Sequence, residues 1–201
     1  MVIAIDGPAG AGKSTVARAV AQRLGFTYLD TGAMYRAVAL AAGAVPDDPV
    51  RVAEAANIEV GERVLLDGED VTEAIRAPGV SAGASWVAVD PGVRAALIRK
   101  QQAIVQHGDW VAEGRDIGSV VAPDAKVKVF LTASLEERAR RRAAELGVDP
   151  EQVLDELRRR DEQDASADRT VHEAAPDATT VDTTGLPLDA VVERIVELAR
   201  R

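Results

Sequence analysis

Short apolar runs alternate along the chain with longer stretches in which apolar positions recur every three or four residues. Residues 2–5 form a continuous apolar run, typical of a strand buried on both faces of a parallel sheet. Residues 14–24 have helical spacing, and Gly25 ends that pattern. Residues 26–29 predict a second strand, and a second helix is expected from residue 31 to residue 43.

This alternation stops at the Pro- and Asp-rich residues 45–49. Residues 57–60 and 63–66 flank Gly61 and Glu62, a pattern that predicts a β-hairpin, and Asp67-Gly68 marks another turn. We therefore interpret residues 46–90 as a small insertion in the strand–helix pattern.

The strand–helix pattern returns after the insertion. It predicts a helix over residues 91–106, strands over 110–112 and 126–131, a charged helical pair over 134–146 and 150–164, a strand over 179–181 and a helix over 186–200. The fold class expected is α/β, with a central parallel sheet flanked by helices.

Composition and charge narrow the class of protein. A chain of 201 residues, 47% hydrophobic and 28% charged, is expected to form one globular domain. It contains no cysteine and two histidines, which excludes disulfides, thiolate catalysis and Cys-bound metals. A net charge of −9 argues against nucleic-acid or anionic-membrane partners. With no signal peptide or membrane-spanning run, we expect a cytoplasmic protein. We also expect a monomer whose partners are small-molecule nucleotides.

The first apolar run is followed by a phosphate-binding motif. Residues 7–14, GPAGAGKS, match G-x-x-x-x-G-K-[ST] in full, and a predicted helix follows. Glycines let backbone N–H groups surround a phosphate, and the helix adds its positive end. Lys13 is expected to reach the outer phosphates of a nucleotide, and the Ser14 hydroxyl to bind Mg²⁺.

A phosphate loop leaves several protein classes open. A GTPase should have an Asn-Lys-x-Asp motif, which is absent from the sequence. A motor ATPase should have an apolar strand ending in Asp, but the strand over 127–131 ends in Thr132. A small-molecule kinase needs a second anion site and a basic lid, and the chain offers candidates for both.

The second anion site is predicted at two strand ends. Thr31 and Arg36 follow the second strand, and Thr31 is expected to cap the next helix. Arg115 and Asp116 follow the strand over 110–112. Ligands of open α/β sheets bind at this carboxyl edge, and arginine binds phosphate oxygens in pairs.

The motifs GPAGAGKST, LDTGAMYR, EGRDIGSVV and RRRDEQD, in this order and spacing, resemble the bacterial cytidylate kinases over nearly the whole chain. The resemblance implies a P-loop NTPase fold and ATP-dependent phosphorylation of CMP or dCMP. It also implies one domain in three parts: a core (about residues 1–45, 91–133 and 166–201), a monophosphate-binding insertion (46–90) and a helical lid (134–165).

The same resemblance assigns roles to single residues. For ATP they are Gly7, Pro8, Ala9, Gly10, Ala11, Gly12, Lys13, Ser14 and Thr15; for the acceptor phosphate Thr31, Arg36 and Arg115; for cytosine Ser85, Arg94 and Asp116; for ribose Arg160 and Asp164. One position departs from the family, because Ala167 stands where an arginine is usual, and Arg169 is expected to substitute for it. Ser85 by itself would be interpreted as a helix cap, and Trp86 is expected to pack in the core rather than on a base.

The acceptor oxygen of a nucleoside monophosphate is already anionic, so no general base is needed. Catalysis should depend on Lys13, Mg²⁺ and Arg115. The arginine-rich segments 138–142 and 158–160 should supply further cations from the lid. Among these we assign Arg142 and Arg158 to the transferred phosphoryl group. A kinase for another small acceptor, and a nucleotide-binding module without an acceptor, remain the alternatives.

Overall fold

The computed structural model describes residues 1–44, 48–166 and 174–201. The chain divides into two compact units, one formed by Met1–Tyr28 with Gly108–Arg201 and the other by Leu29–His107.

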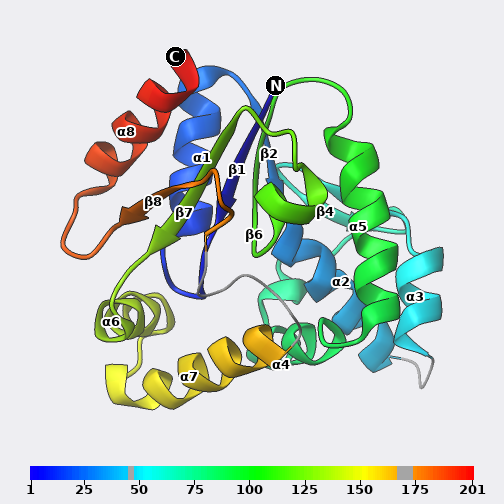
Figure 1. The fold of residues 1–201 in the computed structure, drawn as a ribbon. Helices are drawn as coiled ribbons and strands as arrows, with labels where there is room; N and C mark the ends of the chain where they lie inside the picture. Colours follow the sequence, from blue (N-terminus) through cyan, green and yellow to red (C-terminus); the bar gives the residue numbers. More distant parts are fainter. Residues whose placement is uncertain (45–47, 167–173) are drawn as a thin grey trace. The chain divides into compact units, whose positions relative to one another are not determined.

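The described residues form one sheet of five strands in the order β2-β6-β1-β7-β8 (Figure 1). The strands are β1 (Val2–Asp6), β2 (Thr27–Asp30), β6 (Trp110–Gly114), β7 (Val127–Thr132) and β8 (Thr179–Asp182). Central β1 pairs in parallel with β6 and β7, and β7 pairs in parallel with β8. A strand flanked on both edges and covered on both faces must be apolar throughout, which explains the unbroken run of apolar residues at the start of the chain.

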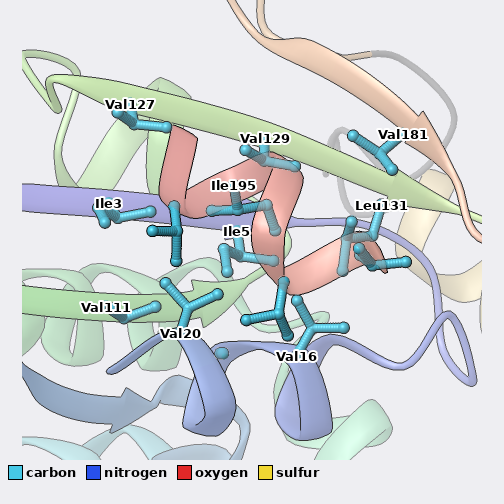
Figure 2. Close-up of a cluster of buried hydrophobic side chains, with 14 of the residues drawn as sticks. Ile3, Ile5, Val16, Val20, Val111, Val127, Val129, Leu131, Val181 and Ile195 are labelled. Carbon is cyan, nitrogen blue, oxygen red and sulfur yellow. The ribbon is translucent and has the colours of Figure 1, made fainter. Parts of the chain in front are cut away.

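Two helices supply most of the apolar surface that packs on this sheet. Helix α1 (Lys13–Leu24) and helix α8 (Leu188–Arg200) contact each other, and their buried residues join those of the strands in one cluster (Figure 2). Ile5, Val20 and Ile195 are fully buried in it. Because β1 and α1 are both fixed by this cluster, the loop between them has two rigid ends.

A pair of charged helices follows β7. Helix α6 (Leu135–Leu146) begins after Ser134, whose side chain accepts a hydrogen bond from the Glu137 N–H, and helix α7 (Pro150–Ser166) packs against it. Ala139, Ala143 and Leu157 form a small apolar cluster between them. Between β6 and β7 the chain makes one short π-helical turn, Ile117–Val121.

The second unit is mostly helical. Its helices are α2 (Thr31–Ala44), α3 (Pro49–Ala55), α4 (Pro78–Val87) and α5 (Pro91–Val105), with a 3₁₀ turn at Ala74–Arg76. Helix α2 packs on α4, and α3 on α5. A small antiparallel sheet contains β3 (Ile58–Val60), β4 (Val64–Leu66) and β5 (Glu69–Asp70).

The predicted parallel sheet, the hairpin and the charged helical pair are confirmed. The sequence reasoning missed β5, the π-helical turn and helix α4. Helix α4, PGVSAGASWV, has few strong helix formers, so its propensity did not predict a helix. Packing on α2 overrides that propensity: a Cβ placed at Gly83 would lie 3.3 Å from the Ala39 Cβ, so only a small residue allows this approach.

Candidate active site

The phosphate loop lies between β1 and α1 and contains three glycines with positive φ (Figure 1). Gly10 and Gly12 have φ values of 76° and 89°, in the left-handed region that favours glycine. At Gly7 a Cβ would lie 2.1 Å from the carbonyl oxygen of Leu131 on β7. The glycines of the motif are therefore required by backbone conformation and by close approach of the neighbouring strand.

Lys13 is the first residue of α1 and is buried. Its Nζ donates to the Pro8 carbonyl oxygen, 2.9 Å away. Burial, together with the positive charge of Arg115, lowers the pKa of Lys13 to about 7. The amine is thus held in the loop, and the positive charge around it favours the binding of an anion there.

Ser14 is bonded to an acidic side chain from the neighbouring strand. Its hydroxyl donates to Oε1 of Glu113, at the end of β6, over 2.5 Å, and the Tyr28 hydroxyl donates to the same oxygen over 2.9 Å. The Arg18 guanidinium lies 4.5 Å from the centre of the Tyr28 ring. The position of the Glu113 carboxylate is therefore determined by two hydroxyl groups.

A hydroxyl and a carboxylate are the hard oxygen ligands that Mg²⁺ prefers, so Ser14 and Glu113 fit that ion. In the described part of the chain no group of three or more His, Asp or Glu side chains could hold a metal. A Mg²⁺ ion here would take its other ligands from phosphate and water, as it does in most nucleotide sites.

Arg115 follows β6 and makes two bonds within this unit. Its Nε donates to Asp164 of α7 and its Nη1 to the Gly7 carbonyl oxygen, both over 2.8 Å. Arg160, which is half-buried, lies nearby. Burial, then the charges of Arg115 and Arg142, lower the pKa of Arg160 to about 10. Within the described residues, the Nε atoms of Arg142 and Arg160 are buried without a hydrogen-bond partner. Arg115 and Arg160 thus lie beside the Asp164 carboxylate, with Arg142 near Arg160, an arrangement suited to binding an anion.

Asp116 is buried, where the chain enters the π-helical turn. Asp6, the last residue of β1, accepts hydrogen bonds from the N–H groups of Ile117 and Gly118, each over 2.8 Å. Burial raises the pKa of Asp6 to about 6 despite those two bonds, and the charge of Asp116 contributes. These bonds fix the backbone that follows Arg115 and Asp116.

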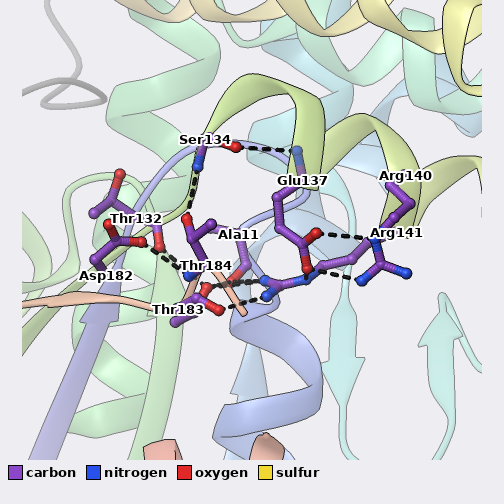
Figure 3. A network of polar contacts seen from close by, with 9 residues as sticks. All are labelled: Ala11, Thr132, Ser134, Glu137, Arg140, Arg141, Asp182, Thr183 and Thr184. Atoms are coloured by element: carbon purple, nitrogen blue, oxygen red, sulfur yellow. Dashed lines mark hydrogen bonds and ion pairs between the residues drawn. The ribbon is translucent and has the colours of Figure 1, made fainter. Parts of the chain in front are cut away.

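The other lid arginines are not equivalent. Arg138 is buried against Asp161, and Arg141 bonds Thr183 in the network of Figure 3. Arg142 pairs with Glu145 over 3.0 Å. Arg158 pairs with Asp155 and its side chain is 57% exposed, whereas the side chain of Arg160, two residues later, is 23% exposed. The assignment of Arg158 to the transferred phosphoryl group stays a prediction.

In the second unit, Asp30 organises the start of α2. Its carboxylate accepts from the Ala33 N–H over 2.9 Å and from Arg36 Nη2 over 2.8 Å. The prediction that Thr31 caps this helix is wrong: Thr31 is its first residue and is buried, and the Asp30 side chain caps it because it can accept from the third N–H. Arg36 is therefore fixed by the carboxylate that also caps its helix.

Ser85 and Arg94 lie on consecutive helices of the same unit, α4 and α5. Ser85 lies inside α4, so its interpretation as a helix cap is wrong. Trp86 is 66% exposed, so its expected core packing is also wrong; Val87 and Ala84 occupy the buried face of this helix instead. The cap of α5 is Asp90, which accepts from the Gly92 and Val93 N–H groups.

The first unit therefore brings together the phosphate loop and the predicted residues Arg115, Asp116, Arg142, Arg160 and Asp164. The second unit contains Thr31, Arg36, Ser85 and Arg94. Arg169, the expected substitute for the arginine missing at Ala167, lies outside the described residues.

A family model described as cytidylate kinase matches residues 3–201. The chain belongs to the cytidylate kinase family.

Relatives that are named cytidylate kinase extend over the whole chain. That of Caldanaerobacter subterraneus subsp. tengcongensis is 50% identical, over 99% of this chain and 94% of its own length. That of Symbiobacterium thermophilum is 49% identical, over 100% and 96%. Members of this family are kinases, that is, phosphotransferases, so this chain is an enzyme of that class.

Solved structures of P-loop kinases have the same fold. A shikimate kinase from Bacteroides thetaiotaomicron has a TM-score of 0.52 at 15% identity, covering 100% of this chain and 99% of its own. A gluconokinase from Sinorhizobium meliloti has a TM-score of 0.52 at 18% identity, covering 99% and 91%. At such identities the likeness concerns the fold alone. The P-loop fold predicted for this cytidylate kinase family member is confirmed.

No helix among the described residues is long and apolar enough to span a membrane.

Sequence reasoning gave no role to Glu113, the acidic partner of Ser14. A pattern that could have identified it is an apolar strand followed by an acidic residue, because Glu113 comes after the apolar residues of the strand beside β1. At the level of sequence this pattern was considered only for the strand before Thr132, which pairs with the other edge of β1. Strand order, which sequence does not give, decides which strand end lies next to Ser14.

Proposed function

We propose that this chain transfers the γ-phosphoryl group of ATP to CMP or dCMP, producing ADP and CDP or dCDP. The observation that carries the proposal is the group of partly buried cations in the first unit: Arg115 and Arg160 lie near Lys13 and the phosphate loop, and Arg142 lies near Arg160. Such a concentration of positive charge lowers the stability of the fold when no anion is bound. Phosphoryl transfer brings two anions together, the phosphates of the donor and of the acceptor.

The residues divide between donor and acceptor. Residues 7–15 bind ATP, with Lys13 on its outer phosphates. Thr31, Arg36 and Arg115 bind the phosphate of the acceptor, Ser85, Arg94 and Asp116 its cytosine, and Arg160 and Asp164 its ribose. The fixed geometry of Arg36 against Asp30 and of Arg115 against Asp164 supports two-pronged binding of phosphate.

Ser14 and Glu113 would hold Mg²⁺, which supplies charge neutralisation of the donor phosphates when it is bound. The protein's own part is to hold the two nucleotides in line and to exclude water. Lys13, Arg142 and Arg158 act on the charge that spreads over the transferred group. No side chain is assigned as a general base, because the acceptor oxygen is already anionic.

The three functional parts are the core, the monophosphate-binding insertion over residues 46–90 and the lid over residues 134–165. The lid assignment is supported by the charged pair α6 and α7, which pack on each other through a small apolar cluster that also includes Ala9 of the phosphate loop.

A coupled assay of ADP release with ATP and, in turn, CMP, dCMP, UMP and AMP tests the proposal. We expect release with CMP and dCMP that is much faster than with UMP or AMP. Absence of release with every acceptor would overturn the kinase activity, and equal rates with UMP and CMP would overturn the cytosine assignment.

A further inference from the structure

Four carbonyl oxygens of the phosphate loop each accept a hydrogen bond from a lysine or arginine side chain. The pairs are Gly7 with Arg115 (2.8 Å), Pro8 with Lys13 (2.9 Å), Ala9 with Arg138 (3.1 Å) and Ala11 with Arg141 (3.3 Å). Two of these cations, Arg138 and Arg141, come from one helix, α6, one turn apart.

The orientation of these carbonyls matters for anion binding. A peptide plane carries its N–H and C=O on opposite sides, so a loop that turns its N–H groups toward a phosphate must turn its carbonyl oxygens elsewhere. A carbonyl that rotated inward would place a partial negative charge against the phosphate. A cation on each carbonyl oxygen opposes that rotation and adds positive potential to the site.

Arg138 is held in place by a second bond. Its side chain is 8% exposed and makes a two-pronged pair with Asp161 of α7, at 3.2 and 2.8 Å. At Gly10 a Cβ would lie 3.0 Å from the Arg138 Cβ, so the helix lies directly on the loop. Asp161 therefore fixes the guanidinium that bonds the Ala9 carbonyl oxygen.

Arg141 is held by the segment that follows β8 (Figure 3). Its Nη2 donates to the Thr183 carbonyl oxygen over 2.7 Å and its Nη1 to the Thr183 hydroxyl over 2.9 Å. The same hydroxyl lies 3.3 Å from the Ala11 carbonyl oxygen and 3.0 Å from that of Thr132. Thr183 is buried, so this junction of β7, β8, α6 and the loop is shielded from water.

We propose that Arg138 and Arg141 are positioning residues for ATP: they keep the Ala9 and Ala11 carbonyls turned away so that the loop's N–H groups remain available to the phosphates. Asp161 and Thr183 contribute indirectly, because their hydrogen bonds hold these two arginines in place. The inference rests on the proposed function, because ATP is its ligand, and it separates these two arginines from Arg142, which is assigned to the transferred group.

The test compares Arg141→Met with the double variant Arg138→Met/Asp161→Asn, which leaves no unpaired charge in the interior. Arg23→Met is the matched control, because Arg23 lies at the far end of α1 in an exposed pair with Glu193. Affinities for ADP and for CMP are measured separately by calorimetry. We expect each loop variant to bind ADP about tenfold or more weakly, with CMP affinity within about twofold of wild type and the control unchanged.

A second readout needs no nucleotide. In amide NMR spectra of the free protein, the Gly10 and Gly12 resonances should shift or broaden in both loop variants and stay in place in Arg23→Met. Thr183→Val, which removes one hydroxyl and keeps the volume, should weaken ADP binding in the same direction, and a conservative Arg141→Lys should restore part of the affinity.

The outcomes are distinguishable. A wild-type chain that binds no ADP would overturn the proposed function together with this inference. Wild-type binding of ADP with unchanged affinity in both folded loop variants would overturn the inference alone. So would an equal loss of ADP and CMP affinity, because that is the result of general destabilisation.

Discussion

Arg160 is half-buried and lies near two cations of its own sign. Arg115 and Arg142 both lower its pKa, while Asp164 and Glu156, which is 3.9 Å away in an ion pair, act in the opposite direction. In the absence of nucleotides such a residue opposes folding, and under the proposed function a bound phosphate would reverse the balance of charge.

Arg160→Met tests this conflict between stability and activity. We expect turnover to fall by about 10²-fold or more, because a residue that positions the acceptor through its ribose is lost, while Tm in the absence of nucleotide rises. Initial rates and thermal denaturation are measured on the same preparation, with Arg23→Met as control. Turnover within about threefold of wild type, or a lower Tm, would contradict the expectation.

Lys13 gives a pH-dependent prediction. In the free protein its pKa is lowered to about 7, so at pH 8 about nine-tenths of the side chain is neutral. Phosphates favour the charged form and raise this pKa, so binding must take up a proton, and ATP affinity should increase as pH falls from about 9 to about 7 and then level off. Calorimetry at pH 8 in two buffers of different ionisation enthalpy measures the uptake; identical heats would count against it.

At the scale of elements, helix starts position the site residues. Asp30 caps α2 and holds Arg36, and Asp90 caps α5, which carries Arg94. Each cap uses a carboxylate immediately before a helix, a preference that sequence alone makes visible.

Asp90→Ala should lower the free energy of unfolding by about 1 kcal/mol, because two N–H groups of α5 lose their acceptor. Asp90→Asn keeps an oxygen in place and serves as the control, with a smaller loss. Urea denaturation followed by circular dichroism measures both. Equal stability of Asp90→Ala and wild type would show that the cap contributes nothing.

Most elements were predictable because their signals are local. Strands such as β1 and β7 are continuous apolar runs, and the hairpin is marked by Gly61. Helix α4 was missed because its residues favour a helix only when they pack on α2. Glu113 was missed because the neighbour of a strand end depends on strand order, and Trp86 was misplaced because hydrophobicity does not say which face of a helix is buried.

At the scale of the whole molecule, a net charge of −9 coexists with anionic substrates. The two agree because positive side chains are concentrated in one part of the first unit, at and near the phosphate loop. They are Lys13, Arg115, Arg138, Arg141, Arg142 and Arg160. Local potential rather than net charge decides what binds.

A nucleotide that binds only the folded chain should stabilise it. At about 100 times its Kd, ADP should add about 2.7 kcal/mol to the free energy of unfolding and raise Tm by several degrees. Differential scanning fluorimetry with ADP, and with sulfate at matched ionic strength as control, measures the shift. An equal shift with sulfate would mean that the cations bind anions without regard to the nucleotide.

The sequence by itself determined the phosphate loop, the α/β pattern and the family, because these are written in contiguous residues and their spacing. Only the tertiary structure decided which cations are bonded to the loop and which carboxylate meets Ser14. Arg138 and Arg142 lie one turn apart on a single helix, yet one is buried against Asp161 and the Ala9 carbonyl, whereas the other pairs with Glu145. The partners of a side chain come from segments distant along the chain, and only packing brings those segments together.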